Sequence, residues 1–190
     1  MNENTNASSR TESEGQVTES DMYRQHLKKV VEKLVIFEKK PKDIEGRQIT
    51  EWFSTGEEIF YEFYQLGNCI KWDYSLLQKG TEVNEVIIKI TKNQEWLQTF
   101  INIYPNLRID LDLVGSAGDV CKIRSGVEVL LRGFVNVDTR FNEVLHDLEE
   151  LGEVDEFDRC LTVWRNTGHR PDFVSNEKQS STPKNHWWWY

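Results

Sequence analysis

Apolar residues recur at every third or fourth position along most of the chain between residues 20 and 170, a spacing typical of helices with one buried face. The first such run can be capped by Thr18 or Ser20, and we expect it to stop before Pro41. Its apolar positions share one helical face and are Tyr23, Leu27, Val30, Val31, Leu34 and Val35. The pattern therefore predicts a first helix over 20–40.

The helical spacing continues over 49–53 and 59–66, where five of the apolar positions on the two faces are aromatic: Trp52, Phe53, Phe60, Phe63 and Tyr64. Because glycine often interrupts or ends helices, we expect Gly56 to separate two short helices and Gly67 to end the second. A further short element is expected over 72–77, ending at Gly80. The large aromatic side chains of these elements are predicted to lie in the core.

Residues 83–104 follow the same period, and we expect one long helix that Pro105 stops. The β-branched stretch VIIKI within it also fits a strand, but its period and length favour helix. Residues 107–113 alternate between apolar and polar, which is a strand pattern. Because no second strand is available to pair with it, we interpret this stretch as helix or extended connector.

Three more amphipathic helices are predicted towards the C-terminal half. The first is capped by Asp119 and covers 120–134, the second covers 141–151 after Asp138 or Thr139, and the third covers 154–164 and ends near Gly168. The expected fold class is mainly α: a single compact bundle of about six to eight helices, formed by a helical domain over residues 20–170.

Polar composition predicts a disordered tail at each end. Residues 1–19 carry four acidic residues, one arginine and few apolar groups, so they cannot bury enough surface to offset the entropy of ordering. Residues 171–190 are expected to be a flexible C-terminal tail that ends in the sequence HWWWY.

Net charge, cysteine spacing and the length of apolar stretches limit the classes of function that the sequence supports. The net charge of -9 disfavours a general nucleic-acid binder, because binding to phosphates depends on clustered Lys and Arg. Cys69, Cys121 and Cys160 lie far apart and lack the spacings of metal sites, so we expect reduced thiols, no metal and no cofactor. No apolar stretch is long enough to span a membrane and no secretory signal is apparent, which favours a cytoplasmic or nuclear location.

Two charged surfaces are candidates for electrostatic association, within one chain or across a dimer. The basic candidate follows the first helix and comprises Arg24, Lys28, Lys29, Lys33, Lys39, Lys40 and Lys42. The acidic candidate lies between Glu143 and Asp158, a stretch that contains no Lys or Arg. It comprises Glu149, Glu150, Glu153, Asp155 and Glu156. For the second set we favour the simpler interpretation, a solvated acidic face.

The C-terminal aromatic cluster is the main candidate for partner binding. Its members are His186, Trp187, Trp188, Trp189 and Tyr190. Buried aromatic rings remove large areas from water and often dominate interface energies. The sequence leaves three destinations open for this cluster: the chain's own domain, a protein partner, or a second copy of the chain.

The function that these features favour is a non-enzymatic, helical protein–protein interaction module, an adaptor or regulatory accessory factor of a cell or a virus. No His, Cys, Ser or Asp spacing indicates a catalytic triad, so no catalytic residue is assigned. The first alternative is a nucleic-acid-associated factor that uses the basic first helix. The second is an enzyme whose site is assembled from residues distant in sequence.

Overall fold

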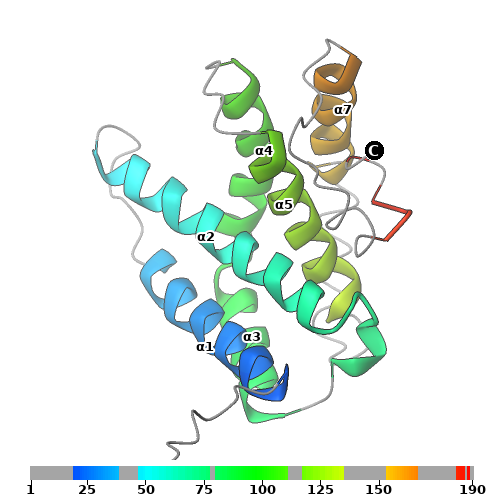
Figure 1. The fold of residues 1–190 in the computed structure, drawn as a ribbon. Coiled ribbons are helices and arrows are strands. Elements are labelled where there is room, and N and C mark those ends of the chain that lie inside the picture. The colour runs from blue at the N-terminus through cyan, green and yellow to red at the C-terminus, as the bar shows by residue number, and fades with distance from the viewer. Residues whose placement is uncertain are drawn as a thin grey trace, which may run out of the picture.

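The computed structural model describes residues 19–38, 47–77, 80–110, 117–134, 153–166, 183–186 and 188. Within these ranges the regular structure is entirely helical (Figure 1). The α-helices are α1 (Glu19–Phe37), α2 (Arg47–Cys69), α3 (Thr81–Lys92), α4 (Gln94–Asp110), α5 (Ala117–Glu128) and α7 (Glu153–Asn166). A 3-10 helix, η1 (Tyr74–Leu76), follows α2, and a π-helical turn, η2 (Val129–Gly133), continues α5. The predicted mainly α bundle is confirmed.

Helix α2 lies across the middle of the bundle and organises the packing of the others (Figure 1). Helices α1 and α5 both pack along α2, α3 packs on α1, and α7 packs on α4. The backbones of α2 and α5 approach closely at Gly126, where a Cβ atom would lie 2.0 Å from the carbonyl oxygen of Phe60. Only glycine allows this approach, so Gly126 brings α5 into the centre of the bundle.

The core is rich in aromatic side chains, as the sequence predicts. Phe60 of α2 stacks on Phe100 of α4 with ring centroids 5.3 Å apart, and Trp52 of α2 stacks on Phe37 of α1 at 5.1 Å. All four side chains are almost fully buried and belong to one continuous apolar cluster. Offset and edge-on ring pairs of this kind add to the stabilisation from area burial alone.

The expected interruption of α2 is wrong, because Gly56 and Gly67 both lie inside one continuous helix. A Cβ atom on Gly56 would lie 2.4 Å from the ring of Phe100, and one on Gly67 would lie 2.6 Å from the ring of Trp72. The glycines therefore make room for aromatic rings from elsewhere in the chain. Their role is in packing and not in ending the helix.

The predicted single helix over 83–104 is also wrong, because the chain turns at Asn93 between α3 and α4. The buried Asn93 side chain donates a hydrogen bond to the carbonyl of Lys89 at 2.8 Å, in addition to the bond that its backbone N–H makes to the same carbonyl at 3.2 Å. Pro105, expected to stop the helix, lies inside α4. Likewise Asp119 does not precede α5 as a cap but occupies its first turn.

Several expectations lie outside the described residues. They concern the helix over 141–151, the end of the alternating stretch over 111–113, and the disorder of residues 1–18 and 171–182. The first helix, the short element near residue 74 and the last helix are confirmed as α1, η1 and α7.

Candidate functional site: the docked C-terminal segment

The C-terminal segment, residues 183–186 and 188, lies against one face of α5. This docking face consists of Cys121, Arg124 and Ser125 of α5 together with Trp72, which follows α2. The three α5 residues are three or four positions apart or adjacent, so they lie on the same side of the helix. The opposite side of α5 packs on α2 through Gly126, which leaves this face for the segment.

A turn brings the segment onto the docking face. The backbone N–H of His186 donates a hydrogen bond to the carbonyl of Pro183 at 2.9 Å. His186 is then fully buried, and Trp188 is only 6% exposed. The imidazole lies between two indoles, edge-on to Trp72 and stacked on Trp188, with 4.7 Å between centroids in each pair. Aromatic packing therefore holds the segment at His186 and Trp188.

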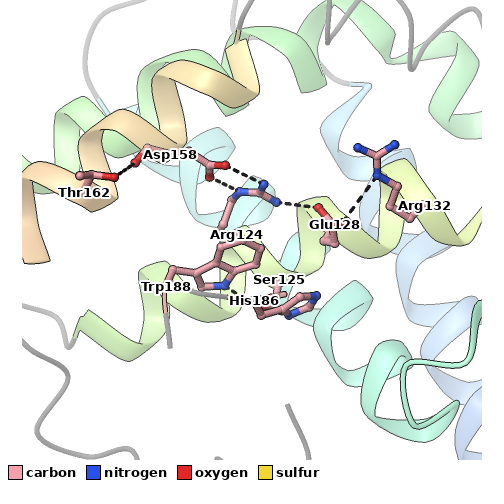
Figure 2. A network of polar contacts seen from close by, with 8 residues as sticks. All are labelled: Arg124, Ser125, Glu128, Arg132, Asp158, Thr162, His186 and Trp188. Carbon is pink, nitrogen blue, oxygen red and sulfur yellow. Dashed lines mark hydrogen bonds and ion pairs between the residues drawn. The ribbon is translucent and has the colours of Figure 1, made fainter. Parts of the chain in front are cut away.

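Trp188 is held in position by contacts with Ser125, Cys121 and Arg124, and Figure 2 shows Ser125 and Arg124 beside it. Its indole Nε1–H donates to Ser125 Oγ at 3.0 Å, and its backbone carbonyl accepts from the Cys121 thiol at 3.3 Å. The Ser125 hydroxyl also lies 3.3 Å from Nδ1 of His186. Since the indole uses the hydroxyl oxygen as an acceptor, the hydroxyl hydrogen remains available to the imidazole.

Arg124 supplies the third contact and connects the segment to α7. Its guanidinium lies 4.2 Å from the centre of the Trp188 ring, within the range of a cation–π interaction. The same group donates to both carboxylate oxygens of Asp158 on α7, at 2.6 and 3.1 Å, and to Glu128 at 3.1 Å (Figure 2). Glu128 in turn lies 3.6 Å from Arg132. Two cations and two carboxylates thus form one network behind the tryptophan.

Burial changes the acid–base properties of the site. Removal from water, together with the nearby positive charge of Arg124, lowers the pKa of His186 to about 4, so the imidazole is neutral at physiological pH. Burial raises the pKa of the Cys121 thiol to about 12. Burial also acts to lower the pKa of Arg124, but hydrogen bonds and charges from Asp158 and Glu128 outweigh it and raise this pKa. The docking face therefore presents one permanent cation, Arg124, to the segment, beside the neutral His186 and Cys121 side chains.

The pairing of Ser125 with His186 has the residue types of a nucleophile and its base, but its environment opposes catalysis. Both side chains are fully buried, Ser125 beneath the segment and His186 within it. The low pKa makes His186 a weak base, and in the described part of the chain its Nε2 atom has no hydrogen-bond partner that would orient it. The pair is better suited to holding the segment than to chemistry.

The structure places two of the five predicted partner-binding residues, His186 and Trp188, on the chain's own docking face. Trp187, Trp189 and Tyr190 lie outside the described residues. Of the three destinations left open by the sequence, the docked arrangement within one chain is the one present here. Whether the cluster binds a partner stays a prediction.

The predicted basic surface is divided between the two sides of α1. Lys29 and Lys33 face α2, where Lys29 lies 3.6 Å from Glu62 and Lys33 forms an ion pair with Glu58. Arg24 and Lys28 line the opposite side, towards α3. Lys39, Lys40 and Lys42 lie outside the described residues. The four described cations do not form one continuous patch.

The predicted acidic surface is described only in part. Asp155 is exposed on α7, and Glu156 forms an ion pair with Arg159. Glu153 is the first residue of α7, whereas Glu149 and Glu150 lie outside the described residues.

Sequence reasoning missed the docking face itself. Arg124 carried the most informative signal, because it stands among buried positions between Val120 and Val127, and Glu128 follows four residues later. A cation within a run of apolar core positions indicates a buried ion pair, although its partner Asp158 lies 34 residues away. No sequence spacing identifies that pairing.

Comparison with known protein families, curated protein sequences and solved structures found no match. Among the described residues, no helix is long and apolar enough to cross a membrane. The same residues contain no group of three or more His, Cys, Asp or Glu side chains positioned to hold a metal ion.

Proposed function

We propose that this chain is a non-enzymatic protein–protein interaction module, an adaptor or regulatory factor, whose docking face recognises a short aromatic segment. The observation that carries the proposal is the docking of His186 and Trp188 on α5 through side-chain-specific contacts. The segment is continuous in sequence and contains a tryptophan anchor, which is how linear motifs bind protein surfaces.

In this proposal the chain's own segment and a partner's segment compete for the docking face. A tethered segment has a high local concentration, so it occupies the face unless a partner binds more tightly or is also present at high concentration. Displacement would uncover the docking face and release the C-terminal aromatic cluster in one step. Both surfaces then become available to other proteins, which is the behaviour expected of a regulated adaptor.

A peptide of residues 183–190 tests whether the docking face is a recognition site. The acceptor is the full chain in which His186 and Trp188 are both replaced by alanine, so that the face is open. We expect saturable binding of the peptide to this acceptor in calorimetry and much weaker binding to the unsubstituted chain. A chain carrying Lys184→Ala is the matched control, because Lys184 is exposed and its loss should leave the face occupied.

The same acceptor tests the partner. Proteins retained by the opened chain and released by the peptide are candidates, whereas proteins that the peptide does not release bind elsewhere. If the opened chain remains folded by circular dichroism and binds neither the peptide nor a peptide-releasable protein, the proposed function is wrong.

The nucleic-acid alternative gains little support from the charges of α1. Two of its four described basic residues, Lys29 and Lys33, are paired with carboxylates of α2. Retention on RNA that decreases as salt increases would nevertheless favour that alternative.

A further inference from the structure

A second surface, independent of the docking face, lies between α1 and α3. A hollow of about 470 Å³ lies at the surface where these two helices pack together, beside the middle of α1 and the first half of α3. Arg24, Lys28 and Glu32 line its α1 side, Glu82 and Glu85 line its α3 side, and Val31 contributes an apolar lining. We refer to this hollow as the α1–α3 groove.

Among the described residues, the charged side chains on the two walls of the α1–α3 groove form no ion pairs with each other. In the described part of the chain no ion pair joins Arg24 or Lys28 to Glu82 or Glu85, and all four side chains are exposed. Lys28 is only loosely paired, 4.0 Å from Glu32 on its own helix. The next pair along, Lys89 and Glu38, does close the space between the helices, at 3.0 Å. The α1 wall therefore has a net positive charge, which lies at Arg24 and Lys28, and the α3 wall is acidic.

Apolar side chains extend this surface beyond the charged walls. Val35 follows Val31 by one turn on α1 and is 39% exposed, and Ile88 follows Glu85 by three residues on α3 and is 44% exposed. Exposed β-branched residues beside a charged groove are a composition found at interfaces with a polar rim. Their burial would add a hydrophobic contribution to any contact made by the charges.

We propose that the α1–α3 groove is a self-association surface, and that its occupant is a second copy of this chain. A partner of one charge sign would be attracted by one wall and repelled by the other. A second copy related by a two-fold axis parallel to the groove places its acidic α3 wall on the basic α1 wall, and its basic wall on the acidic one. The surface is thus complementary to itself, and the contact between a basic wall and an acidic wall occurs twice in the dimer.

Charge exchange between the walls tests this pairing. The acidic variant carries Arg24→Glu and Lys28→Glu, so both of its walls are negative; the basic variant carries Glu82→Lys and Glu85→Lys, so both are positive. Facing like charges weaken association, and we expect sedimentation equilibrium to show a dimer dissociation constant raised about 100-fold or more in each variant alone. An equimolar mixture should restore the dimer, because every wall then faces its opposite.

The mixture is decisive because each variant has like charges within its own groove. Recovery therefore cannot come from contacts inside one chain. A control with Glu95→Lys and Asp155→Lys makes the same change in net charge as the basic variant, at exposed sites on α4 and α7, and it should remain dimeric. Circular dichroism and thermal melting establish that all variants are folded.

The expected set of results is a dimer of the unsubstituted chain that weakens as salt rises, monomeric single variants and a dimeric mixture. A monomeric unsubstituted chain overturns the proposal, as does a mixture that remains monomeric while the single variants are folded. Since the docking face takes no part in these contacts, peptide binding there is unaffected by either outcome.

Discussion

Replacement of Trp188 by alanine should release the C-terminal segment from α5 without unfolding the bundle. The indole is 6% exposed, donates a hydrogen bond to Ser125 and lies over Arg124, so its loss removes the main anchor of the segment. Substitution of a buried Trp by alanine typically costs about 3–5 kcal/mol. Because the segment can leave while the helices remain packed, we expect the lower end, about 3 kcal/mol of docking free energy.

Cys121 reports this release directly. Its thiol is 2% exposed and donates to the Trp188 carbonyl, and burial raises its pKa to about 12. A thiol reagent therefore reaches it mainly in molecules whose segment is undocked. A docking free energy of about 3 kcal/mol corresponds to an opening population of roughly one in 100, so Trp188→Ala should accelerate labelling about 100-fold.

The assay is maleimide labelling near neutral pH, with the modified cysteine identified by peptide mass spectrometry. Labelling of Cys69, which is already partly exposed, provides an internal reference. Lys184→Ala, at an exposed position of the same segment, should leave the rate at Cys121 unchanged. If Trp188→Ala leaves Cys121 as protected as before, the segment does not cover the thiol. If the helical circular dichroism is lost instead, the segment is an integral part of the core and not a docked ligand.

Three further predictions concern the network and the packing around it. Docking of the peptide of residues 183–190 should be strongest above about pH 6.5 and should weaken as the pH approaches 4, because the docked state holds His186 neutral. Calorimetry at about pH 5 should therefore give roughly 20-fold weaker binding than at pH 7. A peptide with His186→Asn should lose this pH dependence. Asp158→Ala should lower the free energy of unfolding in urea by about 3 kcal/mol, because it leaves the buried charge of Arg124 with one partner fewer; a conservative Thr162→Ser change on the same helix should have little effect. Gly126→Ala should lower the melting temperature sharply or prevent folding, because the added Cβ atom would lie 2.0 Å from the Phe60 carbonyl; an unchanged melting temperature would show that α2 and α5 are not in contact there.

The helices that sequence predicts well are those whose boundaries depend on local signals. The apolar period alone locates α1 and α7, since each buries one continuous face. The errors occur where a boundary depends on distant residues. Gly56 has the local properties of a helix breaker, but it remains helical because the ring of Phe100 fills the space beside it. Asn93 ends α3 through a side-chain hydrogen bond that the apolar period does not reveal.

Of the two parts of the candidate site, the sequence predicts the C-terminal segment but not the docking face. His186 and Trp188 stand out in the sequence because large aromatic groups follow a polar stretch. The docking face does not stand out in the sequence, because Cys121 and Ser125 are ordinary small residues of a buried helix and lie more than 60 positions away from Trp188. The pairing depends on which face of α5 remains uncovered once α2 has packed on Gly126, and that is a property of the assembled bundle.

The buried charge behind Trp188 explains how the docking face can discriminate between aromatic segments. A purely apolar surface would accept any large apolar side chain with similar free energy, because hydrophobic burial is not directional. Asp158 and Glu128 hold the guanidinium of Arg124 in a fixed orientation, so its face is presented to the ring while its N–H groups are occupied. Such a cation favours the electron-rich indole, and Ser125 accepts a hydrogen bond that phenylalanine cannot donate. A Trp188→Phe peptide should therefore bind more weakly than its lost area alone predicts, and Asp158→Ala should reduce that difference by freeing the guanidinium to move.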